Sequence, residues 1–475
     1  MAIIFKIIAI ILSPFGRNVW PFRTNFVLLW LKSSQKQTNM KRTAFLLTLV
    51  LLCLTLTAQR KSAREEIAEN RYLCGSNYLD YDRYPATRPL TRTPKGYEPF
   101  YMSHYGRHGS RWLIGKRDYS RVADVLEKAE KDGKLTEKGC WTLEQLHQFM
   151  PSTVKRLGDL TTMGERQHHG IGRRMAEHFP EIFKAKRVSI DARSTVVPRC
   201  ILSMIAECEE LMAANPTARI HNDVSESLQY YLNQPWDRRV KEQSKRVKWE
   251  EKRAYQERLS SPERLMQVLF NDGQWVADSV NMVNLMFDLF EVAANMQSHD
   301  TDVDLLSLFT ADEMYAQWCI RNWSWYLDYG AAPQTGGIMP FSQRNLLRNI
   351  IETADTVLGS LPAKACVQAT LRFGHEVCVM PLACLLELDQ CGVSVESPDS
   401  LDRYWRNYDI FPMACNIQMV FYRPKKGRQG DVLVKVLLNE RETTLPVATT
   451  QWPYYSWNDL RSYYMEKLRK YETEK

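Results

Sequence analysis

The sequence predicts an α/β fold, and three observations support this prediction. Three segments read as strands, helical patterns lie between and after them, and each strand runs into a cluster of polar residues. Strands that alternate with helices form a sheet whose ligands bind beyond the carboxyl ends of the strands. We therefore expect the three polar clusters to converge on one site.

The predicted strands are residues 100–105, 188–192 and 366–373, and the last two show the apolar alternation of a pleated strand. They lead, in order, into Arg107-His108-Gly109, Arg193-Ser194-Thr195 and Gly374-His375-Glu376. Helices are expected over residues 162–178, 199–214 and 379–388. After Asn416, residues 417–422 and 432–438 flank a Pro/Lys/Gly/Arg-rich turn, which predicts a hairpin that closes the core.

The strand signal disappears between about residues 216 and 344, where long helical patterns replace it. Residues 237–258 have the mixed charges expected of a polar helix, and Thr310 and Glu313 predict a capping box for a helix that ends near Gly330. We expect residues 216–344 to be a helical cap domain inserted into a discontinuous core of residues 59–215 and 345–475. A basic polyanion pocket in residues 237–258 is the alternative to a solvated helix face.

The chain has 475 residues with 44% hydrophobic and 25% charged residues, a typical soluble globular composition, and a net charge of +8. Residues 1–58 contain seven Lys or Arg and no Asp or Glu, which leaves 56 basic against 55 acidic residues in the remainder. The basic excess therefore belongs to residues 1–58, which we call the leader, and it gives no reason to expect a nucleic-acid partner.

Within the leader, the probable start Met40 is followed by Lys41 and Arg42, an uncharged apolar run over residues 44–56, and the small residue Ala58. This order predicts a secretory signal peptide, with export to the periplasm or the medium and no stable membrane insertion after cleavage. An N-terminal membrane anchor is the alternative. Ten cysteines remain after residue 58; their even number permits disulfides, and several lie in apolar runs typical of buried thiols.

The segment Arg107-His108-Gly109-Ser110-Arg111 places two guanidinium groups around one imidazole. Arginine forks suit phosphate oxygens, and a neutral imidazole can attack phosphorus and carry the phosphoryl group. Such a reaction needs a further cation, a hydrogen-bond donor and an acid, and Arg193, His375 and Glu376 are residues of these types at the other two strand ends. No metal or other cofactor is required, because the arginines supply the positive charge.

Four motifs resemble those of the histidine acid phosphatases (histidine phosphatase superfamily, branch 2), and within that branch the chain looks most like bacterial multiple inositol polyphosphate phosphatases. The motifs are RHGSR at 107–111, LTTMGERQ at 160–167, RSTVVPRCILS at 193–203 and FGHE at 373–376. The resemblance implies a three-layer α/β/α core like that of phosphoglycerate mutase. It also implies His108 as nucleophile, Glu376 as proton donor, and a phosphate clamp of Arg107, Arg111, Arg193 and His375.

Two positions depart from the family pattern. Leu113 stands where many members have proline, and Val377 stands where the inositol polyphosphate phosphatases have their acid, so that the carboxylate here is one residue earlier, at Glu376. Acting as donor and then as base would require a raised carboxyl pKa at Glu376. The expected function is hydrolysis of an inositol polyphosphate such as phytate through a phosphohistidine, with small phosphorylated molecules as the substrate class.

Several other interpretations are open. Arg193 could be a surface ion-pair partner, and His375 with Glu376 could be an ordinary helix N-terminus. His168 and His169 look like a metal pair, but adjacent helical residues point about 100° apart, which favours surface or packing roles. For the whole chain, the alternatives are hydrolysis of sugar phosphates or other small monoesters, phosphoryl transfer to a second alcohol, and phosphate-ligand binding without turnover.

Overall fold

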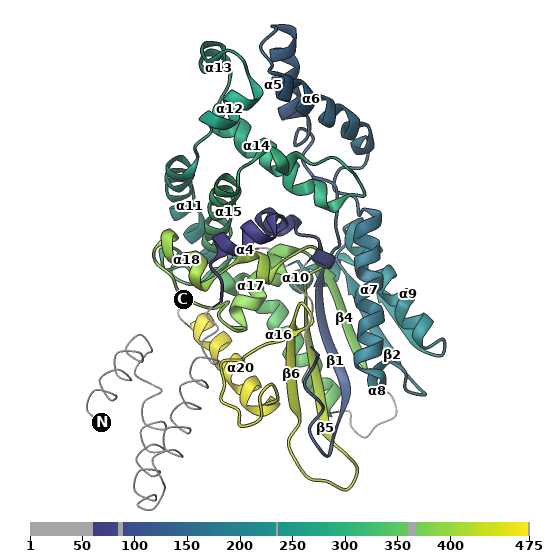
Figure 1. The fold of residues 1–475 in the computed structure, drawn as a ribbon. Coiled ribbons are helices and arrows are strands. Elements are labelled where there is room, and N and C mark those ends of the chain that lie inside the picture. The colour runs from purple at the N-terminus through teal and green to yellow at the C-terminus, as the bar shows by residue number, and fades with distance from the viewer. Residues whose placement is uncertain (1–59, 84–88, 234–235, 360–366, 474–475) are drawn as a thin grey trace, which may run out of the picture. The chain divides into compact units, whose positions relative to one another are not determined.

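The computed structural model describes residues 60–83, 89–233, 236–359 and 367–473. The predicted leader, residues 1–58 with Met40, lies outside the described residues. From Ser62 onward the chain forms one compact unit, shown in Figure 1.

The centre of this unit is an eight-stranded mixed sheet with the order β3-β2-β4-β1-β5-β6-β7, in which β8 also pairs with β6. Strands β1 to β4 are parallel. Strand β5 is antiparallel to β1, and β6 is antiparallel to β5, so that β5 and β6 form the predicted hairpin. The bounds are β1 (Tyr97–Arg107), β2 (Ser189–Ser194), β3 (Arg219–Asp223), β4 (Ala369–Gly374), β5 (Asn416–Pro424), β6 (Leu433–Leu438), β7 (Arg441–Glu442) and β8 (Tyr455–Ser456).

Helices cover both faces of the sheet and complete a three-layer α/β/α core. On one face lie α7 (Thr162–His178), α8 (Pro180–Phe183) and α9 (Pro198–Ala214), whose apolar residues form a cluster with β2 and β4. On the other face lie α10 (Gln229–Leu232), α16 (Arg344–Gly359), α17 (Glu376–Leu385) and α20 (Trp457–Thr473). The predicted α/β fold is confirmed.

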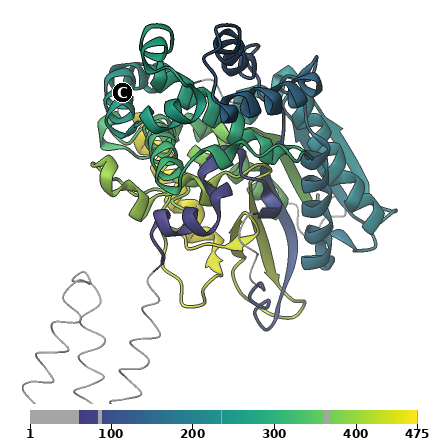
Figure 2. The same ribbon diagram turned by 45° about the horizontal axis from the view of Figure 1, so that its top comes forward.

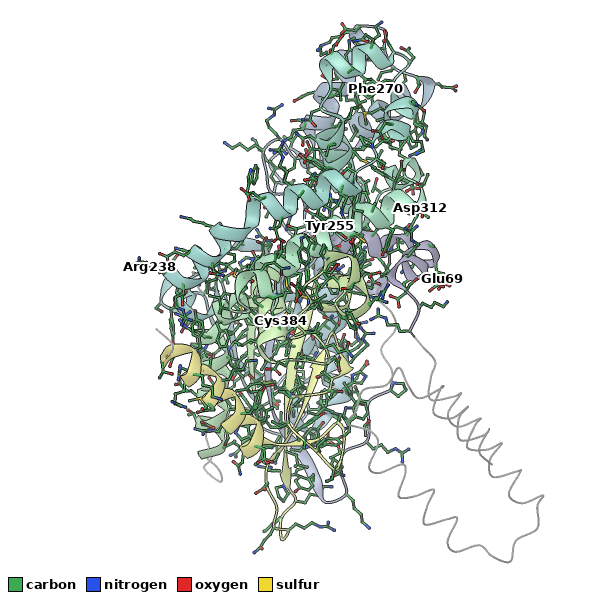
Figure 3. The ribbon with its side chains drawn as sticks, turned by 90° about the vertical axis from the view of Figure 1, so that its left-hand side faces the viewer. Glu69, Arg238, Tyr255, Phe270, Asp312 and Cys384 are labelled. Carbon is green, nitrogen blue, oxygen red and sulfur yellow. The ribbon has the colours of Figure 1, made fainter. Side chains whose placement is uncertain are left out.

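A helical part lies beyond the carboxyl ends of the parallel strands, as Figures 1 and 2 show. Its elements are α5 (Ser120–Lys131), α6 (Glu137–Phe149), α11 (Arg238–Leu259), α12 (Glu263–Leu269), α13 (Gly273–Ser279), α14 (Met282–Asn295) and α15 (Ala311–Tyr329). Figure 3 labels Tyr255 of α11 and Asp312 of α15 in this part. Near it lie α4 (Ala63–Glu69), α18 (Pro398–Tyr404) and α19 (Asn407–Ile410).

Several local predictions match the structure. Helix α7 has the expected bounds, with Thr161 accepting a hydrogen bond from the Gly164 N–H as its N-cap. The Thr310–Glu313 capping box begins α15, which ends before Gly330. Strand β3 was not expected, because it lies between residues 216 and 344, where no strand signal was found.

All nine cysteines in the described part of the chain are free, and eight of them are buried, while Cys140 is exposed. These buried thiols agree with the apolar runs around them. In the same described ranges, no helix combines the length and the apolar character that crossing a bilayer requires.

Candidate active site

The turn that follows β1 is held by main-chain hydrogen bonds from neighbouring strands. The Arg107 N–H donates to the Cys415 carbonyl oxygen (2.8 Å), and the His108 N–H donates to the Gly374 carbonyl oxygen (3.0 Å). The His108 carbonyl oxygen accepts from the Ala414 N–H (3.1 Å). The position of His108 is therefore determined by β4 and by the segment before β5.

Two glycines let this turn approach α7 closely. A Cβ added to Gly109 would collide with the backbone of Gly164, and one added to Gly164 would collide with the backbone of Ser110. The turn is also tied to the helices, since the Ser110 N–H donates to Gln167 Oε1 (2.9 Å) and the Gly109 N–H donates to Ser203 Oγ (3.1 Å). The second and third sequence motifs thus hold the first one in place.

His108 has the geometry of a neutral imidazole with one free nitrogen. Its Nδ1 lies 2.8 Å from the Gly109 carbonyl oxygen, which can only accept, so Nδ1 carries the proton and Nε2 keeps its lone pair. The side chain is fully buried, and this burial, reinforced by the charges of Arg107 and Arg199, lowers the pKa of His108 well below 6.5 although Glu376 opposes the shift. A nucleophilic nitrogen is therefore available at acidic pH.

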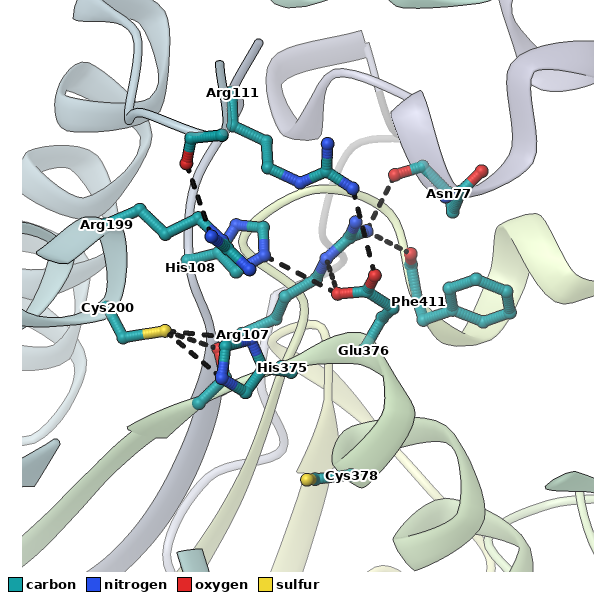
Figure 4. Close-up of polar contacts among 12 residues, drawn as sticks. Asn77, Arg107, His108, Arg111, Arg199, Cys200, His375, Glu376, Cys378 and Phe411 are labelled. Atoms are coloured by element: carbon teal, nitrogen blue, oxygen red, sulfur yellow. Dashed lines mark hydrogen bonds and ion pairs between the residues drawn. The ribbon is translucent and has the colours of Figure 1, made fainter. Parts of the chain in front are cut away.

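Three arginines surround His108, as Figure 4 shows. Arg107 is anchored by its Nη1, which donates to the carbonyl oxygens of Asn77 (2.7 Å) and Phe411 (3.0 Å). Among the described residues, Arg107 Nη2 and the Nε atoms of Arg111 and Arg199 are buried without a hydrogen-bond partner. Buried guanidinium N–H groups that converge without partners indicate a binding site for an anion.

Glu376 is the first residue of α17 and extends toward this anion site. Its Oε2 lies 3.1 Å from Arg107 Nε and 3.5 Å from His108 Nε2, and its Oε1 lies 4.0 Å from Arg111 Nη2. Burial raises the pKa of this carboxyl group, but the positive charges of Arg107 and Arg111 outweigh burial and lower the pKa well below 4.5. The raised pKa expected for Glu376 is therefore not found in this structure, because the arginines reach the carboxylate itself.

His375 is the N-cap residue of α17 and also lies beside His108, with ring centroids 5.7 Å apart. Its Nε2 is 3.3 Å from Thr195 Oγ1, and Cys200 Sγ lies 3.8 Å from both ring nitrogens. Burial, with a contribution from nearby arginines, lowers the pKa of His375 to about 4 even though Glu376 opposes the shift. His375 is therefore a neutral hydrogen-bonding group near neutral pH.

Arg193 does not join the other predicted residues. Its Nη2 pairs with Asp191 Oδ2 (2.5 Å) and its Nη1 donates to the Tyr231 hydroxyl oxygen (3.0 Å). Side chains two residues apart on a strand lie on the same face of the sheet, so Arg193 is on the same face as Asp191. Arg199, in the first turn of α9, lies beside His108 instead, with its Nη1 on the Gly158 carbonyl oxygen (3.3 Å). The RSTVVPRCILS motif contains both arginines, and the prediction selected the wrong one.

His168 of α7 is fully buried and contacts the backbone of the active-site turn. Its Nδ1 lies 3.0 Å from Glu207 Oε2, and its Nε2 lies 3.1 Å from the Arg107 carbonyl oxygen. A carbonyl oxygen and a carboxylate are both acceptors, and a neutral imidazole has a single N–H to donate. Both contacts are therefore hydrogen bonds when the His168 and Glu207 pair holds one additional proton, either on the second ring nitrogen or on the carboxyl group. The neighbouring His169 is partly exposed and pairs with Glu210 Oε1 (3.3 Å).

A metal ion is the other ligand to consider at this position. His108, His375 and Glu376 each offer one ligand atom, and these atoms lie within 4.8 Å of one another. The guanidinium groups of Arg107 and Arg111 face the same point, and their charge opposes a second cation. The donor set therefore favours an anion over a metal.

The comparisons with known proteins agree with this geometry. The family model of the histidine phosphatase superfamily (branch 2) matches residues 106–439. The chain belongs to this superfamily. It is a histidine phosphatase, as the four sequence motifs predicted.

Solved structures show the same fold at low sequence identity. The multiple inositol polyphosphate phosphatase of Bifidobacterium longum, in complex with inositol hexasulfate, has a TM-score of 0.63 and 18% identity over 83% of this chain and 97% of its own. The phytase from D. castellii has a TM-score of 0.60 and 14% identity over 84% of this chain and 85% of its own. None of the curated proteins matches the sequence of this chain.

Proposed function

We propose that this chain is an exported phosphomonoesterase that hydrolyses inositol polyphosphates through a phosphohistidine intermediate. The observation that carries the proposal is the convergence of unpaired guanidinium N–H groups from Arg107, Arg111 and Arg199 around the free Nε2 of His108. A phosphate group held by these donors presents phosphorus to the imidazole nitrogen.

In the first step, the lone pair of His108 Nε2 attacks phosphorus, the bond from phosphorus to the ester oxygen breaks, and the leaving alkoxide receives a proton from Glu376. In the second step, Glu376 as carboxylate takes a proton from water, whose oxygen attacks the phosphohistidine and releases phosphate and neutral His108. The hydrogen bond from His108 Nδ1 to the Gly109 carbonyl oxygen orients the ring throughout.

Protonation of Glu376 follows from substrate binding. In this structure the Glu376 carboxylate is itself the anion that faces Arg107 and Arg111. A bound phosphate takes over their positive charge, whereas the burial of Glu376 remains, and burial favours the neutral acid. The pKa of Glu376 therefore rises when substrate binds, and the acid is prepared only in the complex.

The substrate class is proposed from the resemblance to multiple inositol polyphosphate phosphatases and from fold similarity over 97% of the B. longum protein. Val377 is an argument against this substrate class, because the acidic residue of those enzymes stands at the position of Val377, one residue later than Glu376. Sugar phosphates and other small monoesters are therefore the second candidate class.

The first experiment measures phosphate release from phytate, glucose 1-phosphate and p-nitrophenyl phosphate between pH 3 and 8, with the chain from Gln59 onward. We expect turnover of phytate, loss of turnover in His108→Ala and Glu376→Gln, and little change in the control Arg193→Ala. A full-length chain expressed with its leader should be recovered outside the cytoplasm and begin at Gln59 on N-terminal sequencing.

Other outcomes identify the alternatives. Turnover of glucose 1-phosphate without phytate turnover would replace the substrate class but keep the chemistry. Transfer of the phosphoryl group to added alcohols in place of water would indicate a transferase. Tight binding of phytate without release of phosphate, in wild type and His108→Ala alike, would indicate a binding protein.

A further inference from the structure

In the part of the chain that the structure describes, the outer edge of the sheet is formed by the short strand β3, which pairs with β2 and with no other strand. Three of its five residues are exposed, including Arg219 and His221. Helix α9 lies along this edge, at the right-hand margin of the sheet in Figure 1. An open strand edge is a template on which another strand can pair.

Exposed apolar side chains gather at the same edge. Eleven large hydrophobic residues of the described chain are exposed, and five of them fall within residues 196–224: Val196, Leu202, Ile205, Met212 and Val224. A groove of about 620 Å³ between α9 and β3 is lined by Ile205, Met212 and Ile220, among others. Such a concentration of apolar surface beside an open edge is typical of a protein–protein contact.

The backbone of β3 shows which of its groups face outward. The Arg219 N–H donates to the Val188 carbonyl oxygen (2.9 Å), so the main-chain groups of Arg219 point toward β2. Since these directions alternate along a strand, the N–H and C=O groups of Ile220 and Asn222 point away from the sheet.

We propose that β3 pairs antiparallel with β3 of a second copy of this chain, about a two-fold axis at His221. In this register, Ile220 of one copy lies opposite Asn222 of the other, and their outward main-chain groups form four hydrogen bonds between the copies. The two sheets become one continuous sheet.

Charge complementarity selects this partner and this register. The two-fold axis at His221 places Arg219 of each copy opposite Asp223 of the other, so two pairs of opposite charge form. They occupy non-hydrogen-bonded positions, where facing side chains are closest. On the other face of the sheet, the axis brings the two α9 helices together, and their exposed Leu202, Ile205 and Met212 become covered.

The test uses charge reversal at the two ends of β3, with the chain from Gln59 onward. Light scattering coupled to size exclusion should give twice the mass of one chain for wild type. Arg219→Asp and Asp223→Arg each place like charges opposite one another twice per dimer, and each should give the mass of a single chain. Arg238→Asp, an equal charge change on the exposed surface of α11, should leave the dimer intact.

An equimolar mixture of the two β3 variants provides the decisive measurement. One variant has two acidic residues and the other two basic residues at these positions, so both contacts are complementary in the mixed dimer and the mass should double again. Circular dichroism melting shows that each variant is folded.

A single-chain mass for wild type at all concentrations overturns the proposal. So does a mixture that stays at the single-chain mass, or a dimer that survives either single charge reversal. The apolar edge would then be left for a partner other than a second copy.

Discussion

Arg199→Ala tests the assignment of the third phosphate-binding arginine most directly. The Arg199 guanidinium lies beside His108, and its Nε has no hydrogen-bond partner among the described residues. Its remaining anchor is the bond of Nη1 to the Gly158 carbonyl oxygen (3.3 Å), which leaves the group free to donate to phosphate. Removing it deletes one of three positive charges from a buried anion site.

The size of the effect follows from Coulomb's law in a protein. Two unit charges about 4 Å apart interact by about 4 kcal/mol at an effective dielectric constant of about 20. Rearrangement and rehydration recover part of this, so a loss of about 3 kcal/mol is expected, which corresponds to roughly a 150-fold fall in kcat/KM.

Arg193→Ala is the matched control, because Arg193 belongs to the same motif but pairs with Asp191 and Tyr231. It should change kcat/KM less than about threefold and lower the free energy of unfolding by about 1 kcal/mol. Steady-state kinetics on p-nitrophenyl phosphate and urea unfolding measure both quantities. Equal losses of kcat/KM in the two variants, or a near-normal Arg199→Ala, would refute the placement of Arg199.

Three further predictions concern the surroundings of the site. His168→Ala should lower kcat about tenfold or more, because the Arg107 carbonyl oxygen loses its hydrogen-bond donor. In Glu207→Gln the amide still offers a donor to the His168 ring, so kcat should stay within about threefold of wild type. Acidification from pH 6.5 to 4 should lower the free energy of unfolding. The pKa values of the buried His104 and His375 are about 4 in the folded chain and about 6.5 in the unfolded chain, so the unfolded chain binds more protons in this interval. This loss, measured by urea unfolding, is at most about 3 kcal/mol for each histidine. Gly109→Ala should abolish turnover of p-nitrophenyl phosphate, since the added methyl group collides with the backbone of α7.

Each of these predictions has its own control. His169→Gln changes the partly exposed neighbour of His168 and should leave kcat unchanged. Gly170→Ala lies on α7 where the new methyl group meets only the flexible end of Arg174, so activity should persist. His104→Gln should flatten the pH dependence of stability. Loss of activity in His169→Gln, or equal loss in His168→Ala and Glu207→Gln, would contradict the role of the His168 ring as hydrogen-bond donor.

Local sequence signals were sufficient for much of the fold. Thr161 caps α7 and Pro198 occupies the first turn of α9, and both helices were predicted with nearly their observed bounds. Strand β3 was missed because its sequence, RIHND at 219–223, contains a single apolar residue and lies mostly exposed. Pairing with β2 makes these residues a strand, although their composition does not predict one.

The sequence alone determined which residue types stand at the ends of the strands, and the structure brings five of the predicted residues together: His108, Arg107, Arg111, His375 and Glu376. They meet because parallel strands end at the same edge of a sheet, where residues far apart in the chain lie close together.

Only the tertiary structure decided which side chains face His108 and in which charge state. Strand alternation turns Arg193 toward Asp191, while the first turn of α9 brings Arg199 to the site. The low pKa of Glu376 likewise requires Arg107 and Arg111, which come from a segment about 270 residues earlier. Electrostatic interactions depend on distance in space, and local sequence patterns do not contain that distance.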